Sequence, residues 1–167
     1  YDYSDLAWVA GRLGNPSDAL AAYRRVLALR TEVAEADPND QRAADALASA
    51  VMRIGTTLYA MGDLAGSETE LHRAVALYQK LAAREGAGWQ VVRTLATAHD
   101  DLAVSIEKQC VKRKGGAACL ARAASELTAE RAVLEDLKQK GHLPQADEKQ
   151  IAVVRDHEAR LRGSPVY

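Results

Sequence analysis

The chain has 167 residues, of which 48% are hydrophobic but only 5% are aromatic, and it contains no Phe. An alanine-rich, aromatic-poor composition suits close helix–helix packing better than a β-sheet. The net charge is −1, from 22 basic and 23 acidic residues, which gives no global field for holding nucleic acid or an acidic membrane. No run of 18 apolar residues is present, so no membrane span is predicted.

Helically spaced apolar residues, interrupted by proline and glycine, predict seven helices and essentially no sheet. Their approximate ranges are 2–12, 16–36, 40–61, 64–84, 89–111, 118–140 and 144–161. Pro16 suits the first turn of the second helix, and Gly141 suits a left-handed cap after the sixth. Ile151, Val154 and Leu161 predict an apolar side of the last helix, which would cap the array.

A shift of 48 residues superimposes the pattern on itself. It aligns Leu6 with Ile54 and Leu102, Ala7 with Gly55 and Ala103, and Gly14 with Gly62. Each unit is therefore predicted to be a helical hairpin that buries its apolar faces by stacking on the next. The small residues allow close helix approach, and the Gly14-Asn15 and Gly62-Asp63 turns supply a positive φ and a capping side chain.

A small residue after Leu or Ile, a Gly-Asp turn and then "DALAAYRRVLAL" resemble the tetratricopeptide repeat. Ala19 and Tyr23 match that family's pattern and Val26 is larger than usual, whereas Ser67 and Leu71 replace the alanine and the aromatic in the second unit. The period of 48 exceeds the family's common period of about 34. The third turn, "QCVKRKGGAAC", departs from the pattern.

The resemblance implies an all-α, right-handed solenoid in one domain, residues 1–167. Its hairpins would span about 1–37, 40–85 and 88–141, followed by a capping helix at about 144–162. The first helix would have to start before Tyr1 to equal its counterparts, so the chain is expected to be a fragment of a longer protein.

A second resemblance is to the repeat regions that follow the kinase domain in some bacterial serine/threonine protein kinases. It depends on "ALYQKLAAREG" and "AERAVLEDLKQKGHLPQAD". The sequence itself has no kinase motif. This resemblance implies a regulatory or partner-binding region of such a kinase.

The tetratricopeptide resemblance also implies that the first helix of each hairpin lines a concave groove for a peptide or protein segment. Aromatic and Met side chains there are suitable anchors; alternatively, they pack on neighbouring helices. The predicted partner-binding residues are Trp8, Arg12, Met52, Arg53, Thr56, Tyr59, Asp100, Val104 and Glu107. The groove rows hold no Lys or Asn that would clamp a carboxylate.

No catalytic, cofactor or metal site is predicted. His99-Asp100-Asp101 has no ligand partner at helical spacing and is interpreted as ordinary helix surface. Lys112-Arg113-Lys114 is interpreted as a solvated loop, with a contact for phosphate or an acidic partner as the alternative.

Cys110 and Cys119 lie at adjoining helix ends. They form either one disulfide, which requires an oxidising compartment, or two buried thiols. The protein would be cytoplasmic, or extracytoplasmic if the cysteines are bridged and the parent is a membrane-anchored kinase.

The resulting hypothesis is a non-enzymatic interaction scaffold without cofactor or nucleic-acid partner, in which self-association is an option. The alternatives are a helical small-molecule sensor and a structural spacer or dimerisation element.

Overall fold

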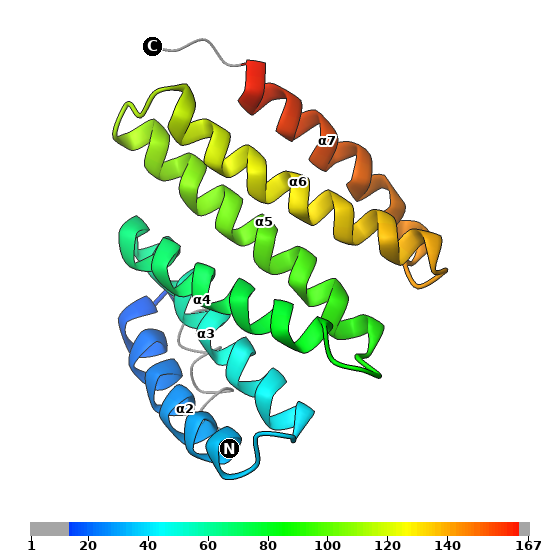
Figure 1. Cartoon of the computed structure of the whole chain (residues 1–167). Helices are drawn as coiled ribbons and strands as arrows, with labels where there is room; N and C mark the ends of the chain where they lie inside the picture. The colour runs from blue at the N-terminus through cyan, green and yellow to red at the C-terminus, as the bar shows by residue number, and fades with distance from the viewer. Residues whose placement is uncertain (1–13, 164–167) are drawn as a thin grey trace. The chain divides into compact units, whose positions relative to one another are not determined.

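The computed structural model describes residues 14–163, and these residues are all-helical with no strand. The helices are α2 (Pro16–Ala36), α3 (Gln41–Met61), α4 (Leu64–Ala82), α5 (Trp89–Lys112), α6 (Ala117–Gln139) and α7 (Glu148–Gly163), with the short 3-10 helix η1 (Gln145–Asp147) before α7 (Figure 1). The predicted all-α fold is confirmed, with consecutive helices packed against each other. The first predicted helix lies outside the described residues.

The described residues form two compact units, which divide within α4 after residue 77. In the first unit, α2 packs against α3. Leu20 and Tyr23 of α2 share a buried cluster with Ile54 and Leu58 of α3. Arg30 adds a hydrogen bond from its guanidinium to the Ala46 carbonyl, 2.8 Å long.

The approach of α3 to α4 depends on a residue without a side chain. A Cβ at Gly55 would stand 2.7 Å from Cγ of Leu71, far inside contact distance. Leu71 is itself 1% exposed. The predicted role of a small residue at this position of the repeat is therefore confirmed at Gly55.

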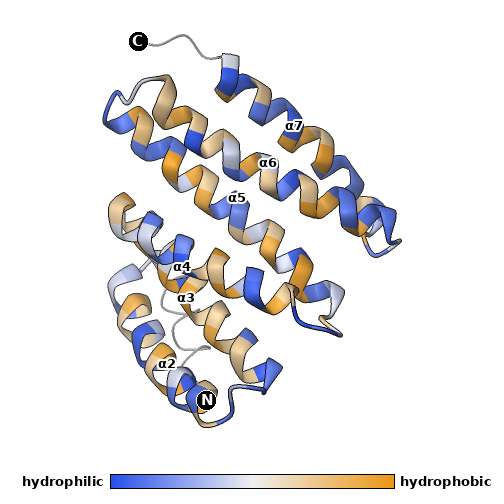
Figure 2. Ribbon diagram, viewed as in Figure 1, coloured by the Kyte–Doolittle hydropathy of each residue, from blue (hydrophilic) through white to orange (hydrophobic). Residues whose placement is uncertain are grey.

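In the second unit, α5, α6 and α7 lie side by side, with α6 packed against both neighbours (Figure 1). Leu102, Ile106, Leu127 and Val154 are buried in this core. Hydrophilic residues gather at the corners between the helices, where the chain reverses (Figure 2). The predicted apolar side of the last helix is confirmed, since Ile151, Val154 and Leu161 are all buried.

The hairpin tips use one type of helix ending. At the tip after α3, Gly62 has φ 81°, its N–H bonds to the Tyr59 carbonyl, and the Asp63 N–H bonds to the Leu58 carbonyl. These two bonds form a Schellman cap, which requires a left-handed residue. Gly141 ends α6 in the same way, with φ 71°, as predicted.

The third tip has the same cap with a lysine in the left-handed position. Lys114 has φ 50°, its N–H bonds to Val111 O, and the Gly115 N–H bonds to Cys110 O. The departure of "CVKRKGGAAC" from the repeat pattern is therefore a displaced cap, because α5 continues for 24 residues where α3 has 21.

Two local predictions need correction. Asp63 caps α4 by accepting from the Gly66 N–H at 3.0 Å, but Asn15 makes no cap bond and donates instead to Asp18, 2.5 Å away. The last helix does not begin regularly at Pro144, because the chain first forms η1. The prediction of one domain and the handedness of the solenoid stay predictions.

Candidate functional site

The structure places the predicted partner-binding residues on α3 and α5. Met52, Arg53, Thr56 and Tyr59 belong to α3 in the first unit, and Asp100, Val104 and Glu107 belong to α5 in the second. Trp8 and Arg12 lie outside the described residues. Each unit therefore has its own candidate surface.

The α3 surface combines apolar and cationic character. Met52 and Tyr59 are half-buried, and Arg53 is exposed. The Thr56 hydroxyl donates to the Arg53 carbonyl at 3.1 Å, so this threonine is bonded to its own helix. Half-buried Met and Tyr side chains still offer contact area to a partner, beside an exposed guanidinium.

A cleft of about 340 Å³ lies between α5 and α7 in the second unit. Two side-chain contacts join α5 to η1 and α7, and the first of them lies in the lining of the cleft. The Asp147 carboxylate lies 2.5 Å from the guanidinium of Arg93, and Nε2 of His157 lies 2.8 Å from the carboxylate of Glu107. Glu107, a predicted partner-binding residue, is thus paired with α7.

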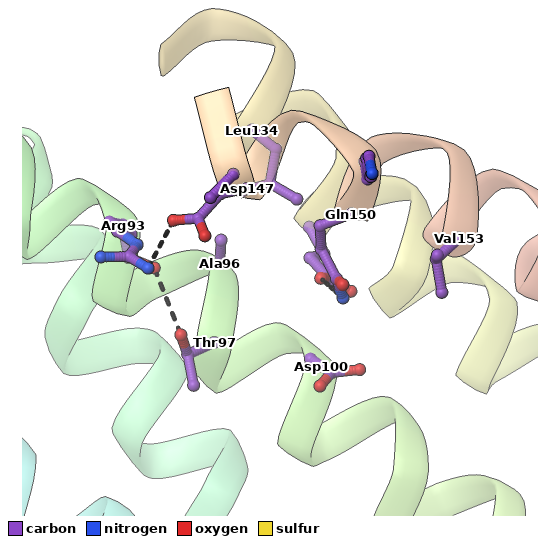
Figure 3. A pocket seen from close by; sticks show the side chains of 11 residues that line it. Arg93, Ala96, Thr97, Asp100, Leu134, Asp147, Gln150 and Val153 are labelled. Carbon is purple, nitrogen blue, oxygen red and sulfur yellow. Dashed lines mark hydrogen bonds and ion pairs between the residues drawn. The ribbon is translucent and has the colours of Figure 1, made fainter. Parts of the chain in front are cut away.

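The side chains that line the cleft come from α5, α6, η1 and α7 (Figure 3). Asp100 projects from α5, and Gln150 lies opposite it on α7. Leu134 and Glu130 of α6 also line the cleft. Apolar and acidic groups thus line the same small space.

Glu130 is the most unusual titratable group of the cleft. Its side chain is 2% exposed, and its Oε2 has no hydrogen-bond partner. Its Oε1 only meets the Gln150 amide at 3.5 Å. Burial, and then the charges of Asp100 and Asp101, raise the pKa of Glu130 to about 8.

Asp100 is perturbed in the same direction. Burial raises the pKa of the Asp100 carboxyl, although the nearby His157 opposes the shift. Two neighbouring acids that resist ionisation are a common sign of a functional site. The sequence signal for Glu130 was available, because it is three residues after Leu127 and four before Leu134, on the apolar stripe of its helix.

His99 corrects the sequence interpretation of His99-Asp100-Asp101 as helix surface. Only 4% of His99 is exposed, and its Nδ1 lies 2.7 Å from the Glu126 carboxylate on α6. It lies four residues after Leu95 and three before Leu102, so it shares their buried face. This pair joins α5 to α6 and has a structural role.

A second polar network holds α7 on α6. The Glu158 carboxylate accepts from the Thr128 hydroxyl at 2.9 Å and from the Arg131 guanidinium at 3.2 Å. Arg162 adds a further bond to Glu158 at 3.1 Å. Burial opposes ionisation, but these bonds together lower the pKa of Glu158.

Cys110 and Cys119 are joined by a disulfide across the tip between α5 and α6, with Cα atoms 5.7 Å apart. A Cβ on Gly115 would stand 3.0 Å from the Cys119 Cβ, so glycine allows the backbone to pass close to the bridge. Lys112, Arg113 and Lys114 are exposed at this tip.

Residues 14–163 contain no group of three His, Cys, Asp or Glu side chains that could hold a metal ion. Within the same range, none of the helices has the length and apolar character needed to cross a membrane.

Comparison with known proteins adds one finding. A family model described as "Tetratricopeptide repeat" matches residues 3–40 and 47–85. No curated protein and no solved structure matches the chain. The matched stretches include α2, most of α3, and α4, and the tip at Gly62 falls inside the second match. The matches support a place for this chain in the tetratricopeptide repeat family.

Proposed function

We propose that this chain is a non-enzymatic interaction module that binds a peptide or protein segment. The observation behind the proposal is the match of two tetratricopeptide repeats, since repeats of this family generally mediate protein–protein interactions. The helical hairpins of the described residues agree with such a role, because a solenoid presents an extended surface for binding.

The first helix of each hairpin supplies the proposed binding face. On α3 this face consists of Met52, Arg53, Thr56 and Tyr59. Met and aromatic side chains commonly provide most of the binding energy at an interface, and an exposed Arg adds hydrogen bonds and charge. A peptide with apolar side chains and a nearby acidic group would match this combination.

Selection from a displayed peptide library, followed by anisotropy titrations, tests the proposal. Met52→Ala, Tyr59→Ala and Trp8→Ala should each weaken binding of a selected peptide about tenfold or more, which corresponds to at least about 1.4 kcal/mol. Glu32→Ala, an exposed change on α2, is the control. Equal affinity in all variants would exclude the α3 face.

The wider context remains part of the proposal. We infer that the chain comes from a longer protein, in which it is the regulatory region of a bacterial serine/threonine kinase. The support is the sequence resemblance described above. The full-length gene tests it: a kinase domain upstream is expected, and its absence would remove this part of the proposal.

Two other functions are alternatives to peptide binding. A dimerisation element would show twice the 18.0 kDa chain mass in solution. A small-molecule sensor is favoured by one observation, the cleft between α5 and α7 with its buried acid.

A further inference from the structure

The cleft in the second unit contains a buried carboxylate oxygen that lacks a partner. Glu130 reaches the cleft from α6, and its Oε2 is buried without a hydrogen bond. Buried polar atoms in native proteins nearly always have a partner, because leaving one unpaired costs free energy. An unpaired, 98%-buried acceptor that lines a cleft therefore indicates that a donor can enter there.

The charges around the cleft indicate what kind of donor group would bind to Glu130. Asp100 and Asp101 on α5 act on Glu130 in the same direction as its burial. Arg93, a cationic side chain of the lining, pairs with Asp147 of η1. His157 of α7, which does not line the cleft, pairs with Glu107. Lys149 of α7 lines the cleft with an exposed side chain. Neither Arg93 nor Lys149 bonds to Oε2 of Glu130, which has no hydrogen-bond partner.

The apolar residues of the lining indicate what the rest of the ligand is like. Ala96, Leu134 and Val153 contribute apolar surface to the same cleft. A space of this size, near the lower limit for ligand sites, suits a short chain and not a large ring system. An alkyl chain with a cationic end matches both features, since its methylenes pack on apolar walls while its head group reaches the acids.

We propose that the cleft between α5 and α7 binds an alkylammonium or alkylguanidinium group, with the carboxylates of Glu130 and Asp100 as its receptors. The group has two sources: a Lys or Arg side chain of a bound peptide, or a free amine. The first source rests on the proposed function, and the second does not.

Binding at this site is coupled to proton release. Glu130 is mostly protonated at pH 7 in the free protein, because its pKa is about 8. An entering ammonium group favours the carboxylate, so Glu130 loses its proton as the cation binds. The affinity should therefore rise with pH, on the order of tenfold per unit below pH 8.

Calorimetric titration of the 167-residue chain tests the site with three probes. They are Nα-acetyl-lysine methylamide, 1,5-diaminopentane, and Nα-acetyl-norleucine methylamide as the uncharged analogue of the first. At least one cationic probe should bind at least tenfold more tightly than the norleucine probe, with close to one proton released at pH 7. Equal binding of charged and uncharged probes, or no binding of either cation, would overturn the proposal.

Variants assign the effect to residues. Glu130→Gln should weaken cation binding at least tenfold and abolish proton release, and Asp100→Asn should weaken binding less. Glu85→Gln removes one exposed charge in the loop before α5, and it should bind as the wild type does. If Glu130→Gln does not fold, Asp100→Asn and the pH dependence of the wild type remain as tests. Unchanged binding in Glu130→Gln would exclude this site.

The same titrations distinguish a peptide side chain from a free amine as the ligand. They also distinguish failure of the cation site from failure of the peptide-binding face on α3. Binding of the lysine derivative without the diamine assigns the site to peptides, and the reverse assigns it to free amines. If cations bind here while no α3 variant affects peptide binding, the cation site stands and the peptide-binding face on α3 fails. If peptides bind through α3 but cations do not bind, the opposite holds.

Discussion

Replacement of Glu130 by glutamine should stabilise the protein at neutral pH. In the folded chain the pKa of Glu130 is raised from 4.5 to about 8. A raised acid pKa means that folding favours the protonated form. The carboxyl therefore costs nothing below about pH 4, costs progressively more between the two pKa values, and costs its maximum above pH 8.

The size of the effect follows from this shift. Each pH unit between 4.5 and 7 adds about 1.4 kcal/mol, so ionisable Glu130 lowers the free energy of unfolding by about 3 kcal/mol at pH 7 and about 1 kcal/mol at pH 5. Glutamine has nearly the same shape and does not titrate. The difference in unfolding free energy between variant and wild type should therefore grow by about 2 kcal/mol from pH 5 to pH 7.

Urea unfolding followed by circular dichroism at several pH values measures this difference. The buffers should contain no amine, because an ammonium ion that binds the cleft would stabilise the wild type. Glu85→Gln, which removes an exposed carboxylate, should show no comparable pH dependence. A constant difference between Glu130→Gln and wild type from pH 5 to pH 8 would refute the assignment of a raised pKa to Glu130.

Three further substitutions test the packing and the turns. Gly55→Val should lower stability by about 1–3 kcal/mol in thermal unfolding because α4 leaves no room for it, whereas Ala60→Val on the exposed side of α3 should cost much less; equal losses would contradict the close contact. Lys114→Gly should raise stability by up to about 1 kcal/mol in urea, because glycine adopts the left-handed conformation without strain, and a loss would argue against that cap. Changing Cys110 and Cys119 together to serine should lower the free energy of unfolding by about 2–3 kcal/mol, and a gain in intact mass of the wild type on reduction checks that the bridge is present.

Much of the fold could be predicted from the sequence because the boundaries of a helix depend on residues that are close together along the chain. Pro16, Gly62 and Gly141 mark helix boundaries through their own backbone preferences, and the structure places each boundary there. The 48-residue repeat identified Gly55 as a contact position without any knowledge of its partner. The predictions for the start of α7 and for the capping role of Asn15 were wrong, because the geometry of the neighbouring backbone decides both.

The candidate site was harder to predict. The repeat pattern identified Arg53 and Tyr59 as candidate partner-binding residues, and their role in binding stays a prediction. Glu130 and His99 were on apolar stripes, but a polar residue in such a place is informative only when its surroundings are known. The pairing of His99 with Glu126 links residues 27 positions apart, and no local pattern predicts that distance.

The helices, their turns and their repeat could be derived from the residues alone, because these features depend on interactions among neighbours along the chain. Which acid of α6 has a partner depends instead on how the helices pack. Glu126 meets a histidine on α5, while Glu130, one helical turn later, reaches a cleft where its Oε2 has no hydrogen-bond partner. The ionisation of a buried carboxylate depends on the dielectric and the charges around it, and both are set by helices that pack from distant parts of the sequence.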